Sequence, residues 1–76
     1  MELEEKAEEV LELLWIHIEE DGKNSVPMKT IEFDNNFENI EHLLKAGYIS
    51  IEDDQVRLTP AGRPLARNVV RRHRVF

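Results

Sequence analysis

The sequence contains no cysteine, and it has few glycines, prolines and aromatic residues, with 3 Gly, 3 Pro, 1 Trp, 1 Tyr and 3 Phe among 76 residues. Without cysteine the chain has no disulfide framework and no cysteine-ligated zinc site. It also lacks a phosphate-binding glycine loop and a nucleophile motif, so we do not expect an enzyme. The absence of cysteine fits a reducing compartment, and we expect a cytoplasmic protein.

Long apolar runs are absent from the start of the chain as well. The first twenty residues carry nine charged side chains, which excludes a signal peptide and a membrane span in that segment. A chain of this length buries only about 60% of its unfolded surface. We therefore expect one small domain over residues 1–76, completed by a second copy of the chain or by a larger parent protein.

Charge is abundant and unevenly distributed, and the formal net charge is −6. Residues 1–54 hold all 16 acidic side chains and four lysines, whereas residues 55–76 hold six arginines and no acid. This asymmetry predicts either an anionic partner for the C-terminal end or attraction between the two ends, within one domain or across a dimer.

Four of the arginines recur at steps of four, four and three, so they share one side of the last predicted helix: Arg63, Arg67, Arg71 and Arg74. This side either faces phosphates or pairs with glutamates of the first helix, and we expect pairing for at least part of it. We place Arg67, Arg71 and Arg74 at an interface, together with Trp15 of the first helix.

Apolar residues at spacings of three and four predict three helices in the first two thirds of the chain. These helices cover residues 2–20, residues 28–33 and the segment from residue 37 to Gly47. Ser25 and Pro27 are typical of a helix start, so we expect them to open the second helix. Leu44 is one of the apolar residues whose spacing marks the third helix.

Residues 48–58 alternate apolar and polar side chains around Asp53-Asp54, which predicts a two-stranded hairpin. Thr59 then predicts a helix cap, and Pro60 the first turn of a final helix. The order helix, helix, helix, hairpin, helix is that of a winged helix. The expected fold class is therefore α+β, mainly α, with a helix-turn-helix, a two-stranded wing and a C-terminal helix.

The segment LTPAGRPLA at residues 58–66, followed by VVRRHR at residues 69–74, resembles the diphtheria-toxin-repressor and manganese-regulator family of metal-dependent transcriptional regulators. The resemblance implies an N-terminal winged-helix domain that binds duplex DNA as a homodimer and responds to a divalent transition metal. Only His73 matches a ligand position of that family, and Val10 stands where the family has a Met or Asp ligand. The segment between Ile31 and Gly47 is also shorter than the family pattern.

The residues that we expect to contact DNA lie on the second helix, the third helix and the wing: Lys29, Thr30, Asn35, Asn36, Asn39, His42 and Arg57. Asparagine can bond adenine through two hydrogen bonds in the major groove, whereas lysine and arginine hold the phosphate backbone. Asn35 and Asn36 have an alternative role as caps of the turn. Glu38 and Glu41 of the third predicted helix disfavour contacts with phosphates, because carboxylates and phosphates are both negatively charged.

Two functions follow from these observations. The leading hypothesis is the DNA-binding domain of a transcriptional regulator, acting as a homodimer without a membrane partner. The alternative is a winged-helix module for protein interaction or dimerisation that no longer binds DNA, which the acidic third helix favours.

Overall fold

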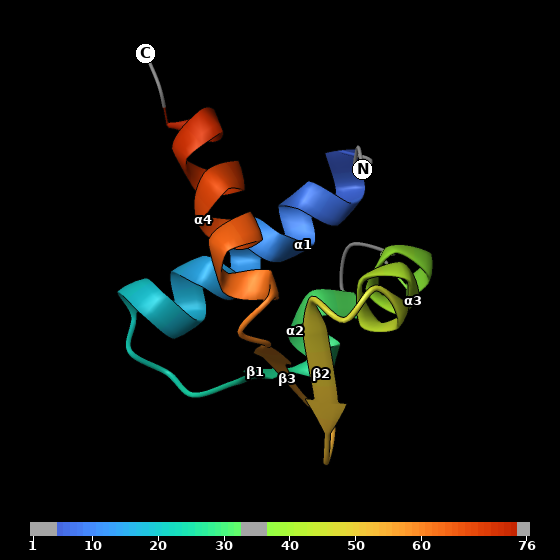
Figure 1. The fold of residues 1–76 in the computed structure, drawn as a ribbon. Coiled ribbons are helices and arrows are strands. Elements are labelled where there is room, and N and C mark those ends of the chain that lie inside the picture. The colour runs from blue at the N-terminus through green and yellow to red at the C-terminus, as the bar shows by residue number, and fades with distance from the viewer. Residues whose placement is uncertain (1–4, 33–36, 75–76) are drawn as a thin grey trace.

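The computed structural model describes residues 5–32 and 37–74 of the chain. They form an α+β fold that is mainly helical, with a small antiparallel sheet at one end (Figure 1). In chain order the elements are α1 (Glu5–Trp15), η1 (Ile16–Glu20), β1 (Val26–Pro27), α2 (Met28–Glu32), α3 (Phe37–Lys45), β2 (Ile49–Glu52), β3 (Gln55–Leu58) and α4 (Gly62–His73). None of the helices in the described ranges is long and apolar enough to cross a membrane.

The first predicted helix is present, but its last five residues have a different geometry. In η1 the helix widens to a π-helix, and the Asp21 N–H donates to the Ile16 carbonyl at 2.9 Å. Apolar spacing does not distinguish this geometry from an α-helix, because Trp15 and Ile18 still pack against the core. The helical segment ends before Gly22, whose φ of 75° is unfavourable for residues with a Cβ.

The prediction that Ser25 and Pro27 open the second helix is wrong. Val26 and Pro27 form the edge strand β1, which pairs with β3 through Val26 opposite Val56. The Ser25 hydroxyl donates to the Gln55 side-chain oxygen at 2.8 Å instead of capping a helix. Proline is tolerated here because an edge strand has one side without a ladder partner. The sheet therefore has three strands in the order β1-β3-β2, rather than two.

The predicted hairpin is confirmed. Strands β2 and β3 pair antiparallel, with Ile49 opposite Leu58, and a two-residue turn joins them. The turn residues Asp53 and Asp54 have φ angles of 52° and 60°. Both angles are left-handed, as a tight turn between twisted strands requires.

Thr59 acts as the predicted cap of the final helix. Its hydroxyl accepts the Gly62 N–H at 3.0 Å and donates to the Gly47 carbonyl at 2.6 Å. The α-helical geometry of α4 begins at Gly62, two residues later than expected, after a turn at residues 60–61. One side chain thus ties the end of α3, the wing and α4 together.

The core lies between α1, α4, the inner face of the sheet and the two middle helices. The largest fully buried side chains come from all of these elements: Leu11, Leu14, Ile31, Ile40, Leu43, Ile49, Val56 and Val69. Of all described elements, α1 and α4 pack most extensively against each other. Leu44, one of the apolar residues that mark α3, is 41% exposed on the outer side of the helix.

Candidate nucleic-acid interface

Five of the residues expected to contact DNA lie in the described part of the chain, on α2, α3 and β3. Lys29, Thr30 and His42 are exposed, and Asn39 is half-buried. Asn35 and Asn36 fall in residues 33–36, outside the described part of the chain, so their predicted role stays a prediction. The exposed positions leave α2 and α3 accessible to a partner.

The outer face of α3 is acidic rather than basic. Glu38, Glu41, His42 and Lys45 line a shallow concavity on this face. The Lys45 ammonium lies 2.9 Å from a carboxylate oxygen of Glu41, one helical turn earlier. The charges of Lys45 and Glu41 cancel in this ion pair. The carboxylate of Glu38 therefore gives this face of α3 a net negative charge.

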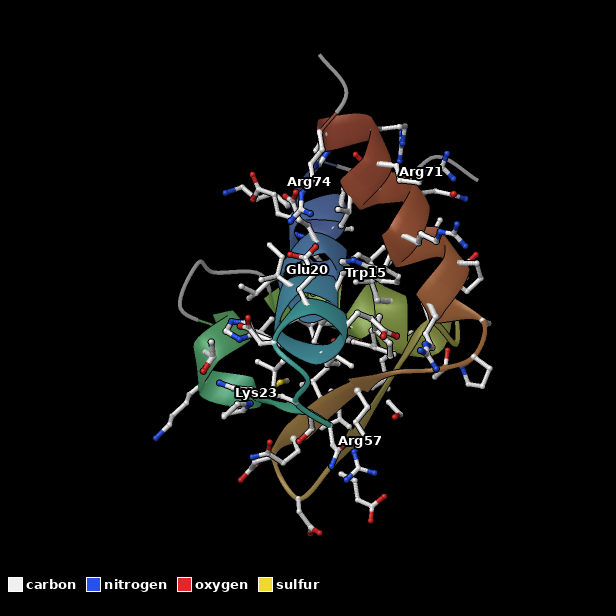
Figure 2. The ribbon with its side chains drawn as sticks, turned by 90° about the vertical axis from the view of Figure 1, so that its left-hand side faces the viewer. Trp15, Glu20, Lys23, Arg57, Arg71 and Arg74 are labelled. Carbon is white, nitrogen blue, oxygen red and sulfur yellow. The ribbon has the colours of Figure 1, made fainter. Side chains whose placement is uncertain are left out.

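Lys29 and Arg57 line two different depressions of the surface. Lys29 lies beside Asp54 and Gln55 of the hairpin, in a depression that Pro27 and Met28 complete. Arg57 projects from the sheet face opposite the core and lines a separate hollow with Lys23 and Arg63. Figure 2 shows Lys23 and Arg57 on the same side of the molecule, near the loop that follows η1. The structure therefore does not join Arg57, Lys29 and His42 into one continuous basic surface.

The arginines of α4 divide into two groups. Arg63 pairs with Glu19, and Arg74 lies 2.7 Å from a carboxylate oxygen of Glu20. The expectation that part of the arginine stripe pairs with glutamates of the first helical segment is confirmed for these two residues. Arg67 and Arg71 are exposed and form no ion pair within residues 5–32 and 37–74. In Figure 2, Arg74 points toward Glu20, whereas Arg71 projects from the other side of α4.

A further ion pair joins α4 to α1. The Arg72 guanidinium lies 2.6 Å from a Glu8 carboxylate oxygen, although Arg72 is not part of the predicted stripe. The hydrogen bond to Glu20 raises the pKa of Arg74 above its usual value, as expected for a guanidinium paired with a carboxylate. Within a single chain, carboxylates of the first helical segment therefore form ion pairs with several of the basic side chains at the C-terminal end.

His73 also takes part in this contact between helices. Its Nδ1 lies 3.2 Å from Glu12 Oε1, and its Nε2 lies 3.6 Å from Glu8 Oε1. The two carboxylates approach different ring nitrogens, so the three side chains do not converge on one point. Val10 is buried in the core, and no group of three potential ligands is present in the described part of the chain. This arrangement does not fit a metal site, because a bound metal needs its ligands around a common centre.

The sequence analysis missed the cluster of Lys23 and Arg63 with Arg57. In the sequence, Lys23 belongs to the turn after the first helix, and Arg63 to the stripe on the last helix. No sequence spacing links these positions, since they come together only when the loop after η1 folds over β3. Trp15, expected at an interface, is half-buried and packs partly against the core.

No protein-family model, curated protein or solved structure matches this chain. The resemblance to metal-dependent regulators therefore rests on the sequence motifs alone and stays a prediction.

Proposed function

We propose that this chain is a winged-helix domain that binds duplex DNA as part of a transcriptional regulator. The observation that supports this proposal most directly is the order of elements, in which β1 lies before α2 and α3 and pairs with β3 of the hairpin. A helix-turn-helix followed by a hairpin is a recurrent arrangement of DNA-binding domains. The LTPAGRPLA segment at the exit of the hairpin adds the family resemblance.

In this proposal α3 enters the major groove, whose width of about 12 Å admits an α-helix. His42 and Asn39 are then the groups closest to base edges, and Glu38 or Glu41 can accept a hydrogen bond from a cytosine amino group. Lys29 holds a phosphate next to the hairpin. A homodimer requires two half-sites separated by about one helical turn or a multiple of it.

An NMR titration of the labelled protein with a mixed-sequence duplex tests this function. We expect shifts at residues 29–30 and 38–45 that weaken between about 50 mM and 200 mM salt, because phosphate contacts release counterions. Lys29→Ala should weaken binding and reduce the salt dependence, whereas Lys6→Ala, an exposed lysine at the start of α1, should leave both unchanged. Absence of shifts on α2 and α3 at the lower salt would refute the proposal.

The acidic outer face of α3 and the exposed Leu44 favour a second function, a protein-interaction or dimerisation module. The ion pairs between α4 and the first helical segment also reduce the positive charge offered to DNA. In this case α3 shows no shift with any duplex, and sedimentation detects self-association that Leu44→Ser weakens. A monomer at all concentrations, together with DNA-induced shifts on α3, would exclude this alternative.

A further inference from the structure

A hollow between the loop after η1, β3 and the first turn of α4 collects three cationic side chains. Lys23 comes from the loop after η1, Arg57 from β3 and Arg63 from the first turn of α4. The hollow has a volume of about 330 Å³, which is at the lower end of the range for small-ligand sites. Three separate segments of the chain thus converge on a space suited to a small group.

The charge of this hollow is opposite to that of the whole chain. Glu19 is the one acidic residue that lines it among the described residues, and Glu19 is engaged by Arg63. Lys23 and Arg57 have no ion-pair partner in residues 5–32 and 37–74. The hollow therefore keeps a local positive charge in a chain with a formal net charge of −6.

The side chains of the hollow also determine which ligand chemistry fits. Lysine and arginine only donate hydrogen bonds, and the amide NH2 group of Asn24, which also lines the hollow, adds further donors. A ligand must therefore be rich in acceptors and negatively charged. A phosphate group meets both requirements, since it presents several oxygens to donors that approach from different directions.

We propose that Lys23, Arg57 and Arg63 form a binding site for a phosphate group. The site shares only Arg57 with the residues expected to contact DNA, whereas Lys23 and Arg63 are not among them, and none of the three lies on α2 or α3. The phosphate belongs either to a small phosphate ligand or to the backbone of a nucleic acid, and both present the same oxygens to the hollow.

An NMR titration of the intact chain with inorganic phosphate tests the proposal, with sodium chloride and sodium acetate at equal ionic strength as references. We expect saturable shifts at Gly22, Lys23, Arg57 and Arg63 with phosphate that exceed those with chloride or acetate. Lys23→Ala should weaken phosphate binding by up to about five-fold, since an exposed charge pair contributes under about 1 kcal/mol. Arg57→Gln should have a similar effect, because its side chain is exposed on the sheet and is not part of the core.

Lys6→Ala is the matched control, because Lys6 is an exposed lysine that does not line the hollow. Shifts that do not saturate, that chloride reproduces, or that Lys6→Ala weakens as much as Lys23→Ala would overturn the proposal. A parallel titration with a DNA duplex identifies the source of the phosphate. Shifts in the hollow that inorganic phosphate competes away indicate the nucleic-acid backbone, and a hollow that responds to phosphate but not to duplex indicates a small ligand. Both results are distinguishable from the test of the DNA-binding function, which is read from duplex-induced shifts of α2 and α3.

Discussion

Gly62 is the position where one added methyl group should affect this fold most. It is buried in the first turn of α4, and a Cβ placed there would lie 2.7 Å from the carbonyl carbon of Tyr48 and closer still to the carbonyl oxygen. Both are backbone atoms. The oxygen also accepts the Thr59 N–H at 3.1 Å, so it cannot turn away without losing that bond. In Gly62→Ala, α4 must move away from the start of β2.

The expected change in the free energy of unfolding combines two costs and one gain. Overpacking of a well-filled site costs about 1–3 kcal/mol, and weakening the hydrogen bond from Thr59 costs about 1 kcal/mol more. The higher helix propensity of alanine returns about 1 kcal/mol. We expect a net loss of roughly 1–3 kcal/mol in the free energy of unfolding. A domain of this size has only about 4–11 kcal/mol in total, so Tm should fall by about 5–25 °C.

Thermal and urea unfolding followed by far-UV circular dichroism measure this loss. Gly22→Ala is the matched control, because no atom lies within 4 Å of the place that a Cβ would take at Gly22, and only the φ of 75° disfavours a side chain. That substitution should cost about 1 kcal/mol. The reasoning is refuted if Gly62→Ala unfolds at or above the Tm of the unsubstituted protein, or if it costs less than Gly22→Ala.

Two further substitutions test the turn and the contact between the first and last helices. Asp54→Gly should raise Tm by a few degrees, because the φ of 60° is free of strain only for glycine; a lower Tm would contradict this account. Glu8→Gln should lower the free energy of unfolding by less than about 1 kcal/mol at low salt, through loss of the charge that faces Arg72. Glu9→Gln, at an exposed position outside the described ion pairs, should have no effect. The Glu8 effect should vanish near about 1 M sodium chloride, and a loss that persists at that salt would contradict an electrostatic origin.

The parts of the fold that sequence reasoning predicted correctly are those with local signals. Asp53-Asp54 between two alternating segments predicts the hairpin. Thr59 predicts the cap of α4, because the hydroxyl and the amide that it accepts lie within one turn. The apolar spacing of α1 selects the buried residues Ala7 and Leu11.

The parts that sequence reasoning missed depend on contacts between distant residues. Strand β1 is two residues long, too short to show a period, and it exists because Val26 meets Val56 of a strand formed much later in the chain. The π-helical turn of η1 shares its apolar spacing with an α-helix. Leu44 follows the spacing of α3, but it lies at the margin of the buried side.

The same limit applies to the candidate surfaces. Glu38 and Glu41 are visible in the sequence as an acidic face of one helix, because residues three apart on a helix are neighbours. The hollow of Lys23, Arg57 and Arg63 has no such local signature. The opposite charges of the two halves of the chain predict an attraction, but not which arginines pair and which stay exposed.

The close packing of α1 against α4 has a consequence for how the chain folds during synthesis. Leu11 and Leu14 of α1 belong to the same buried cluster as Ala66 and Val69 of α4, although α2, α3 and the whole sheet separate the two pairs along the chain. Long-range contacts of this kind slow folding, because the chain must close a large loop before they form. Translation therefore delivers nearly the whole segment before its core can close, and folding should follow as one late cooperative step.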